Sequence, residues 1–461
     1  MSLRIIFTLV LNFLLVSSFF GQDEDAHMIK KIHDEALGNG KAYFWLKEMC
    51  QNHGGRIAGS EAYNSAANYT RHMLSTIRGV KSYFQSCEAA YWKRGDKEKV
   101  FIMDEKGKKT HLHALSLGNS VSTPGKGITA EVIEVQSLDE VENLGFANIK
   151  GKVVFFNRPM DPTQIRTFSA YGGAVDQRAY GPSKAAEYGA VAAIVRSMTT
   201  ASDDFPHTGL TIYNDSLQRI PGIAISTNDA DKLSAKLKTG RIKVFLKTNC
   251  KMMGMRPAPT VIGEMTGSEF PDEIILIGGH LDSWDVGQGA HDDGSGCMQA
   301  MEVLRIFEAT GYKPKRTIRA VLFSNEENGL VGGINYAKIS NESGEFHLAA
   351  LESDAGGFSP RGFSFDADTA VFKTYFRHIN QWLPLLESYG LSFEKGGSGA
   401  DISLLKSQKG LLIGLRPDSQ RYFDFHHTAN DRIENVNKRE LELGAAAMAS
   451  LIFLIDKYGI K

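Results

Sequence analysis

The segment Gly278 to Gly296 contains four aspartates and two histidines but no lysine or arginine. It directly follows an apolar run, residues 273–277, of the kind that forms a buried strand. Neighbouring carboxylates repel one another unless a cation binds them or one of them is protonated. Acids and imidazoles at a strand end therefore predict a cation site in the loop that follows, where open α/β sheets bind ligands.

Acids and histidines also follow other apolar runs in the second half of the chain. Glu326 and Glu327, then Asp354, and finally the pair His426 and His427 each come after such a run. The carboxyl ends of parallel strands open on one edge of a sheet, so these side chains can converge. Zn²⁺ accepts mixed imidazole and carboxylate ligands, and two ions that share a bridging carboxylate need about five of them.

Each of these residues has an ordinary explanation by itself. His280 alone is explained as a hydrogen-bonded histidine at a strand end. One of Asp292 and Asp293 is explained as the N-terminal cap of the following helix, and Glu326 with Glu327 as a solvated charge pair. These explanations must all hold together to replace the metal site, so the combined pattern favours metal chemistry, with one glutamate as ligand and the other as proton acceptor.

The elements that would position these residues form a regular alternation. From Pro257 onward, apolar strand-like runs alternate with stretches that have one apolar face. This order predicts an α/β fold in which a mostly parallel mixed sheet carries helices on both faces. The expected strands are residues 273–279, 317–324, 347–353 and 410–415, and the expected helices are residues 294–307, 329–340, 369–390 and 438–458.

Two regions differ from this alternation. Residues 1–22 combine one arginine with a short apolar stretch, which predicts a secretory signal cleaved near its end and an exported chain, periplasmic or extracellular. Residues 125–250 follow a linker-like stretch and have a strand and helix pattern of their own, which predicts a smaller inserted α/β domain. The main domain then comprises residues 23–124 and residues 251–461, and the latter part carries the metal site.

Composition narrows the classes of partner. The chain has 52 Lys and Arg against 53 Asp and Glu, a formal net charge of −1, which provides no long-range attraction for nucleic acid. No membrane span is expected in the mature chain. The four cysteines allow three pairings that the sequence does not distinguish, and Cys297, inside an expected helix, fits a small buried residue better than a disulfide partner.

Four motifs carry a family resemblance. They are GGHLDSWDVGQGAHDDGSG, FSNEENGLVG, ESDAGG and FHHTANDRIENV, in this order. With them the chain resembles the secreted di-zinc exopeptidases of the bacterial aminopeptidase type, and most closely their plasma glutamate carboxypeptidase, or carboxypeptidase Q, branch. The stretch GGRIAGSEAYNSAANY and residues 125–250, which resemble a protease-associated domain, extend the similarity over nearly all of the mature chain. The resemblance also suggests a homodimer.

The resemblance implies two Zn²⁺ ions per chain and a ligand set for each. Asp292 would be the carboxylate that bridges the ions. His280 and Asp354 would complete the ligands of one ion, and Glu327 and His427 those of the other.

The resemblance also implies catalytic roles. Glu326 would be the general base that takes a proton from the attacking water and returns it to the leaving amine. Asp282 would orient the His280 side of the centre. His426 is ambiguous beside His427, and Asp285 has no expected role. The glycine-rich residues 395–403 are expected near one end of the substrate, with a plain flexible turn as the alternative.

The activity that follows is hydrolysis of terminal peptide bonds in small peptides or dipeptides. Aminopeptidase, carboxypeptidase and dipeptidase action all remain open, because candidate groups exist for either end of a peptide. Two other functions are weighed. A glutaminyl cyclase-like acyltransferase would use a single zinc ion, and a receptor-like binding protein would hold no metal.

Overall fold

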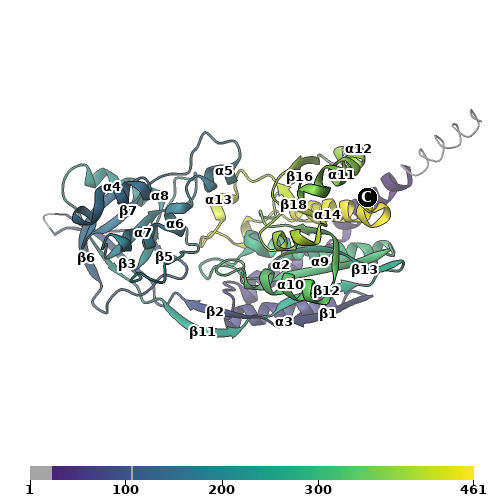
Figure 1. The fold of residues 1–461 in the computed structure, drawn as a ribbon, viewed down its shortest axis with the longest axis horizontal. Coiled ribbons are helices and arrows are strands. Elements are labelled where there is room, and N and C mark those ends of the chain that lie inside the picture. Colours follow the sequence, from purple (N-terminus) through teal and green to yellow (C-terminus); the bar gives the residue numbers. More distant parts are fainter. Residues whose placement is uncertain (1–22, 105–106, 461) are drawn as a thin grey trace, which may run out of the picture.

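The computed structural model describes residues 23–104 and 107–460, so the predicted signal segment lies outside the described residues. Figure 1 shows two lobes. Each lobe contains an eight-stranded sheet. A two-stranded antiparallel ribbon of β2 (Glu88–Lys93) and β11 (Lys251–Pro257) runs between the lobes (Figure 1).

The larger lobe is built on a mixed sheet whose four central strands are parallel. The strand order is β1-β12-β14-β13-β15-β18-β16-β17, and pairing is parallel from β14 through β13 and β15 to β18. On either side, β12 and β16 join antiparallel. The prediction of a mixed sheet with a parallel core is confirmed. The bounds are β1 Val80–Gln85, β12 Thr260–Met265, β13 Phe270–His280, β14 Arg316–Phe323, β15 Phe346–Glu352, β16 Pro360–Asp366, β17 Ser392–Lys395 and β18 Leu411–Pro417.

Helices cover both faces of this sheet, which explains why its central strands are largely apolar. In β13, Ile275 and Ile277 belong to one apolar core and Leu276 to another, because side chains alternate across a strand. The first core includes residues 23–39, α2 Ala42–His53, α3 Glu61–Ser75, α9 Ser295–Thr310 and α14 Lys438–Tyr458. The second includes α10 Val331–Ser343 and the 3-10 helix η3 Ile402–Gln408.

The single helix expected over residues 369–390 is wrong. The structure has α11 (Thr369–Ile379), a 3-10 turn η2 (Asn380–Trp382) and a short α12 (Leu383–Glu387). Pro384 lies in the first turn of α12. Proline is tolerated there because it has no N–H to donate, and for the same reason it cannot continue the hydrogen bonding of the preceding helix.

The smaller lobe has the same kind of architecture around a second sheet, ordered β4-β3-β10-β6-β7-β8-β9-β5. Strands β6 to β9 are parallel, and α4, α7 and α8 pack on the sheet. The strands are β3 Lys99–Met103, β4 Lys109–His111, β5 Ala114–Ser116, β6 Ile128–Val135, β7 Val153–Phe156, β8 Ala192–Arg196, β9 Gly222–Ile225 and β10 Lys243–Lys247. The helices are α4 Leu138–Ile149, α5 Thr167–Gly172, α6 Asp176–Ala179, α7 Gly181–Glu187 and α8 Thr227–Leu237.

Three strands of the smaller lobe precede residue 125. β3 and β4 pair with each other beside β10, and β5 pairs with β9 at the other edge of the sheet. The sheet of the smaller lobe therefore also uses residues 99–116, which were expected to belong to the main domain. The domain boundaries at residues 124/125 and 250/251 themselves stay a prediction.

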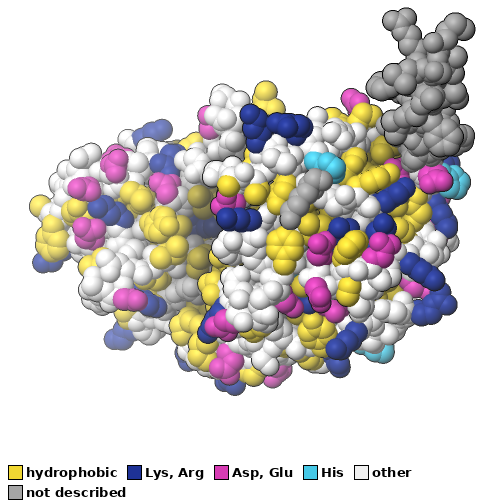
Figure 2. All heavy atoms as spheres, turned by 45° about the vertical axis from the view of Figure 1, so that its right-hand side comes forward, with side chains coloured by type: hydrophobic (Ala, Val, Ile, Leu, Met, Phe, Trp, Pro, Cys, Tyr) yellow, Lys and Arg dark blue, Asp and Glu magenta, His cyan; other side chains and the backbone are white. Residues whose placement is uncertain are grey.

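The structure shows the state of the cysteines, the distribution of charge on one face and the character of the helices. All four cysteines are free thiols, and Cys297 is fully buried in α9. Figure 2 shows basic and acidic side chains interspersed over one face of the molecule. None of the helices in the described ranges has the length and apolar character to cross a bilayer.

Candidate metal centre

The parallel strands of the larger lobe bring the predicted residues to one edge of the sheet. β13 ends at His280, and β14 and β15 are followed in sequence by Glu327 and Asp354. Asp292 lies in the turn η1 (Ala290–Gly294) that leads into α9. His427 follows α13 (Tyr422–Phe425), a short helix between the two lobes (Figure 1).

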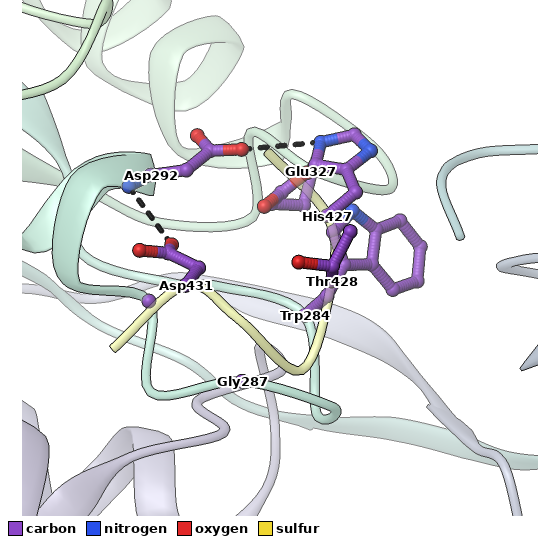
Figure 3. A pocket seen from close by; sticks show the side chains of 8 residues that line it. Trp284, Gly287, Asp292, Glu327, His427, Thr428 and Asp431 are labelled. Atoms are coloured by element: carbon purple, nitrogen blue, oxygen red, sulfur yellow. Dashed lines mark hydrogen bonds and ion pairs between the residues drawn. The ribbon is translucent and has the colours of Figure 1, made fainter. Parts of the chain in front are cut away.

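Asp292 lies between two pairs of these side chains. Its Oδ1 is 3.3 Å from His280 Nε2, and His280 Nε2 is 3.5 Å from Asp354 Oδ1. Its Oδ2 is 3.2 Å from His427 Nε2, and His427 Nε2 is 3.0 Å from Glu327 Oε2. Figure 3 shows the carboxylate of Asp292 directed toward His427. Each oxygen of one carboxylate thus faces an imidazole that also contacts a second carboxylate.

The cluster is buried and short of hydrogen-bond donors. His280 is 1% exposed and Asp292 is 5% exposed. Within the described part of the chain the buried Glu327 Oε1 accepts no hydrogen bond, and Asp292 Oδ2 accepts none either, although His427 Nε2 lies 3.2 Å from it. Such oxygens are costly to bury unless a donor or a cation contacts them. Two imidazoles and three carboxylates form a ligand set that Zn²⁺ accepts, so the residues fit this metal.

The pKa values of the cluster reflect its excess of acid. Burial alone would raise the pKa of Asp292, but the imidazoles of His280 and His427 hold it well below its ordinary value. Burial raises the pKa of Glu326 well above its ordinary value; His280 opposes this rise, and the neighbouring carboxylates Asp354 and Glu327 add to it. Burial also raises the pKa of Glu327 to about 6. The histidines therefore neutralise the cluster only in part.

Asp282 holds the backbone of two residues of the cluster. Its carboxylate is fully buried and accepts hydrogen bonds from the backbone N–H groups of Glu326, at 3.1 Å, and Glu327, at 3.2 Å. His280 Nδ1 is 3.0 Å from the backbone oxygen of Asp282 but 3.9 Å from its carboxylate. The contact with His280 is therefore made mainly by the backbone, and the carboxylate holds the two glutamates.

Asp293 and His426 lie beside the cluster. Asp293 accepts hydrogen bonds from the backbone N–H groups of His280, at 3.1 Å, and Gly296, at 3.0 Å, so it serves as a cap for the start of α9. The ring of His426 stacks on that of His427 with centroids 3.5 Å apart. Its Nε2 is 3.7 Å from Asp292, farther than that of His427.

Two residues that position the centre had no expected role. Asp431 accepts hydrogen bonds from the backbone N–H groups of Ala290, His291 and Asp292, at 2.7 to 3.1 Å, and so holds the turn that carries Asp292 (Figure 3). The fully buried Arg56 donates to three backbone carbonyls of the loop between β13 and that turn. Both residues lie inside sequence motifs that carry the family resemblance. Their position in these motifs is the sequence signal that could have indicated a role at the centre.

Asp285, which also had no expected role, joins the two lobes. The Arg94 guanidinium donates to both of its carboxylate oxygens, at 2.7 to 3.0 Å. Arg94 is 7% exposed and also donates to the backbone oxygen of Ser116, in β5 of the smaller lobe. The loop that precedes Asp292 is thereby tied to the second sheet.

The smaller lobe contacts the centre directly through its residue Thr208. The backbone N–H of Thr208 donates to the backbone oxygen of His427 at 3.0 Å, and His427 Nδ1 is 3.3 Å from the backbone oxygen of Thr208. His427 has a φ of 63°, a value that residues other than glycine adopt infrequently. Arg178 Nη1 lies 3.4 Å from the same ring nitrogen. The smaller lobe therefore helps to hold the backbone and the ring of His427.

Comparisons with known proteins identify the family of the chain. Residues 260–452 match Peptidase family M28. Carboxypeptidase Q of Bos taurus is 31% identical over 417 residues, which cover 90% of this chain and 85% of that protein. The crystal structure of a Peptidase M28 precursor from Shewanella amazonensis SB2B is 30% identical with a TM-score of 0.88, and the match covers 94% of this chain and 97% of that one. BSAP, a zinc aminopeptidase from Bacillus subtilis, is 18% identical with a TM-score of 0.63 over 90% of this chain and 94% of its own, which indicates a shared fold.

Proposed function

This chain belongs to peptidase family M28, and from this premise we propose that it is an exported zinc exopeptidase that hydrolyses terminal bonds of small peptides or dipeptides. The observation that carries the proposal is the position of Asp292, whose two oxygens face two separate imidazole and carboxylate pairs. The names of the bovine relative, a carboxypeptidase, and of the Bacillus subtilis protein, an aminopeptidase, support action at a peptide terminus.

Two Zn²⁺ ions would be held by these residues. Asp292 would bridge them, His280 and Asp354 would complete one ligand set, and Glu327 and His427 the other. The buried oxygens of Asp292 and Glu327 that lack a hydrogen bond support this assignment. When bound, Zn²⁺ polarises a peptide carbonyl and lowers the pKa of water towards about 7.

Glu326 would move the proton during hydrolysis. Its carboxylate Oε2 is 4.0 Å from His280 Nε2 and its side chain is 23% exposed, so it borders the cluster and still reaches solvent. Asp282 holds its backbone N–H and thereby fixes the direction of the side chain. In the proposed reaction the Glu326 carboxylate takes a proton from the attacking water and then donates it to the amine that leaves.

The remaining parts of the proposal rest on the resemblance. The segment 1–22 would be removed during export, the smaller lobe would be a protease-associated domain, and the chain would form a homodimer. N-terminal sequencing of secreted protein and light scattering on purified protein test the first and last of these.

The experiment that tests the function combines metal content with hydrolysis. The chain from residue 23 is dialysed against Zn²⁺, its zinc is counted per chain, and hydrolysis is followed on dipeptides blocked at one terminus, at the other or at neither. Two zinc ions and hydrolysis that a chelator removes and zinc restores are the expected results.

The alternatives give different results in the same experiment. One zinc ion together with cyclisation of peptides that begin with glutamine would indicate an acyltransferase of the glutaminyl cyclase kind. Folded protein with neither zinc nor hydrolysis would indicate a binding protein. Either result would overturn the proposed function.

A further inference from the structure

A cavity of about 480 Å³ lies between the lobes. Phe168 and Ser169 of α5 line it from the smaller lobe, and residues of β16, β17 and β18 line it from the larger one. Figure 1 shows α5 on the side of the smaller lobe that faces β16 and β18. Its volume is in the range of about 300 to 1,000 Å³ that is typical of small-ligand sites.

Three arginines and a single carboxylate give this cavity an excess of positive charge. Arg166, Arg361 and Arg416 line it, together with Glu394. Arg166 pairs with Glu394 at 2.8 Å. Arg361 pairs at 2.9 Å with Asp418, a residue outside the lining, and both partners reach solvent.

Arg416 is the arginine without a counter-ion. Its Nε donates to Ser364 Oγ at 2.7 Å and its Nη2 donates to the backbone oxygen of Gly397. Among the described residues no carboxylate lies within ion-pair distance of this half-buried side chain, and its Nη1 donates to none of them. Burial lowers the pKa of Arg416, and the more distant Glu394 and Asp354 offset this only in part. The guanidinium is held through Nε and Nη2, and its remaining nitrogen, Nη1, can donate hydrogen bonds to an anion.

Arg416 lies on the same edge of the sheet as the proposed metal ligand Asp354. Strands β15 and β18 are parallel, and Glu352 pairs with Gly414. Asp354 and Arg416 each lie two residues further along, so they are neighbours at the same carboxyl edge of the sheet. The glycine-rich residues 395–403, expected near one end of the substrate, contribute Gly396 and Gly397 to the cavity wall.

Resting on the proposed function, we propose that this cavity binds a carboxylate of the peptide substrate through Arg416, with Arg166 and Arg361 adding positive charge. The carboxylate is either the free C-terminal group or an acidic side chain of the residue that leaves. In the first case the enzyme prefers a free C-terminus and acts mainly as a dipeptidase or carboxypeptidase. A carboxylate bound in this way would form charge-assisted hydrogen bonds with the guanidinium.

Three matched substrates separate these cases on the zinc-loaded enzyme. They are Ala-Leu, Ala-Leu amide and Ala-Glu amide, which carry a C-terminal carboxylate, no carboxylate and a side-chain carboxylate. We expect kcat/KM to be at least about tenfold higher for Ala-Leu, or for Ala-Glu amide, than for Ala-Leu amide, since one charged hydrogen bond contributes about 1.5 to 3 kcal/mol. The preferred substrate then identifies the carboxylate.

Arg416→Met tests the residue itself. We expect it to raise KM for the preferred substrate about tenfold or more and to change KM for Ala-Leu amide far less, with Arg416→Lys between it and the wild type. Arg219→Met, which removes an arginine from an exposed pair with Asp215, is the matched control and should change neither substrate. A variant that fails to fold would also lose activity on the amide, so the amide serves as an internal measure of folding.

The results also separate this inference from the proposed function. Equal kcat/KM for all three substrates in the wild type would overturn the carboxylate site and leave the exopeptidase standing. An Arg416→Met variant that keeps the wild-type preference would do the same. Zinc-loaded wild type that hydrolyses none of the three would overturn both.

Discussion

The two lobes have similar sheets but different carboxyl edges. In the smaller lobe the parallel strands β6 to β9 are followed by the neutral residues Gln136, Asn157, Ser197 and Ser226. Asn157 donates to Glu134 at 2.7 Å, Ser197 donates to the backbone oxygen of Ile225 at 2.7 Å, and Ser226 caps α8. The larger lobe has at this edge a cluster of acids and histidines in which two buried carboxylate oxygens lack a hydrogen bond.

The comparison shows that a similar parallel sheet can end in two chemically different edges. Both edges are built by parallel strands that end in polar residues, and in the smaller lobe protein groups satisfy the polar atoms described above. In the larger lobe they do not, because carboxylates cannot donate to one another when ionised. The smaller lobe instead contacts the centre through Thr208, beside His427, and contributes Arg166 to the cavity between the lobes.

The largest effect is expected at the charged edge, from Glu326→Gln. The amide cannot take a proton from water, so kcat should fall by about 10³-fold. Zinc content should stay at the wild-type value, because Glu326 is not among the proposed ligands. Steady-state kinetics and metal analysis measure both, with Glu308→Gln in α9 as the control. Unchanged turnover would remove Glu326 from the role of general base.

A smaller effect is expected from Asp431→Asn. The carboxylate accepts three backbone N–H groups of the turn that carries Asp292, whereas an amide would direct an N–H group at one of them. Loosening this turn should weaken zinc binding roughly 10- to 100-fold, the usual effect of a residue that orients a ligand. Competition with a chromophoric chelator measures the affinity. Asp368→Asn, at the N-terminus of α11, should leave it unchanged, and an equal affinity in both variants would contradict the role of Asp431.

The connection between the lobes is tested by Asp285→Asn. Arg94 is 7% exposed, and the substitution leaves its charge with only the more distant Glu98, at 3.5 Å. We expect a loss of about 1 to 3 kcal/mol in the free energy of unfolding. Asp215→Asn removes an exposed pair and should cost less than about 0.5 kcal/mol. Denaturant titration compares them, and equal losses would show that the Arg94 pair does not stabilise the contact between the lobes.

The smallest effect is expected at the neutral edge. Asn157→Ala removes the hydrogen bonds to Glu134 and from Arg196, but Glu134 retains Ser234 and Arg196 retains Asp231. The free energy of unfolding should fall by about 1 kcal/mol. Zinc content and kcat should stay at the wild-type values. A loss of zinc in this variant would show that the two edges are not independent, contrary to the comparison above.

Much of the fold could be predicted because its signals are local. The apolar runs of β13, β14, β15 and β18 and the last helix α14 are visible as patterns of side chains, and their order implies parallel strands. The break between α11 and α12 was missed although Pro384 marks it, because the apolar pattern continues through it. That β3 to β5 pair in the sheet of the smaller lobe could not be predicted, because short strands carry no information about their partners.

The candidate site divides in the same way. Acids and histidines that follow apolar runs could be found from the chain, and so could the expectation that they meet at one sheet edge. The partner of Asp285 could not be found from the sequence, since Arg94 lies 191 residues earlier in the chain. The cavity at Arg416 could not either, because its walls come from both lobes.

By itself, the sequence determined the types of side chain at each strand end, since strands and turns follow from neighbouring residues. Only the tertiary structure decided that one oxygen of Asp292 faces His280 and the other faces His427, and that Arg416 has no counter-ion among the described residues. These are distances between residues far apart in the chain, and they depend on how the two sheets and the loops between them pack. The physical reason is that local propensity selects elements, whereas packing of the whole chain sets which charged groups meet and which are left without a partner.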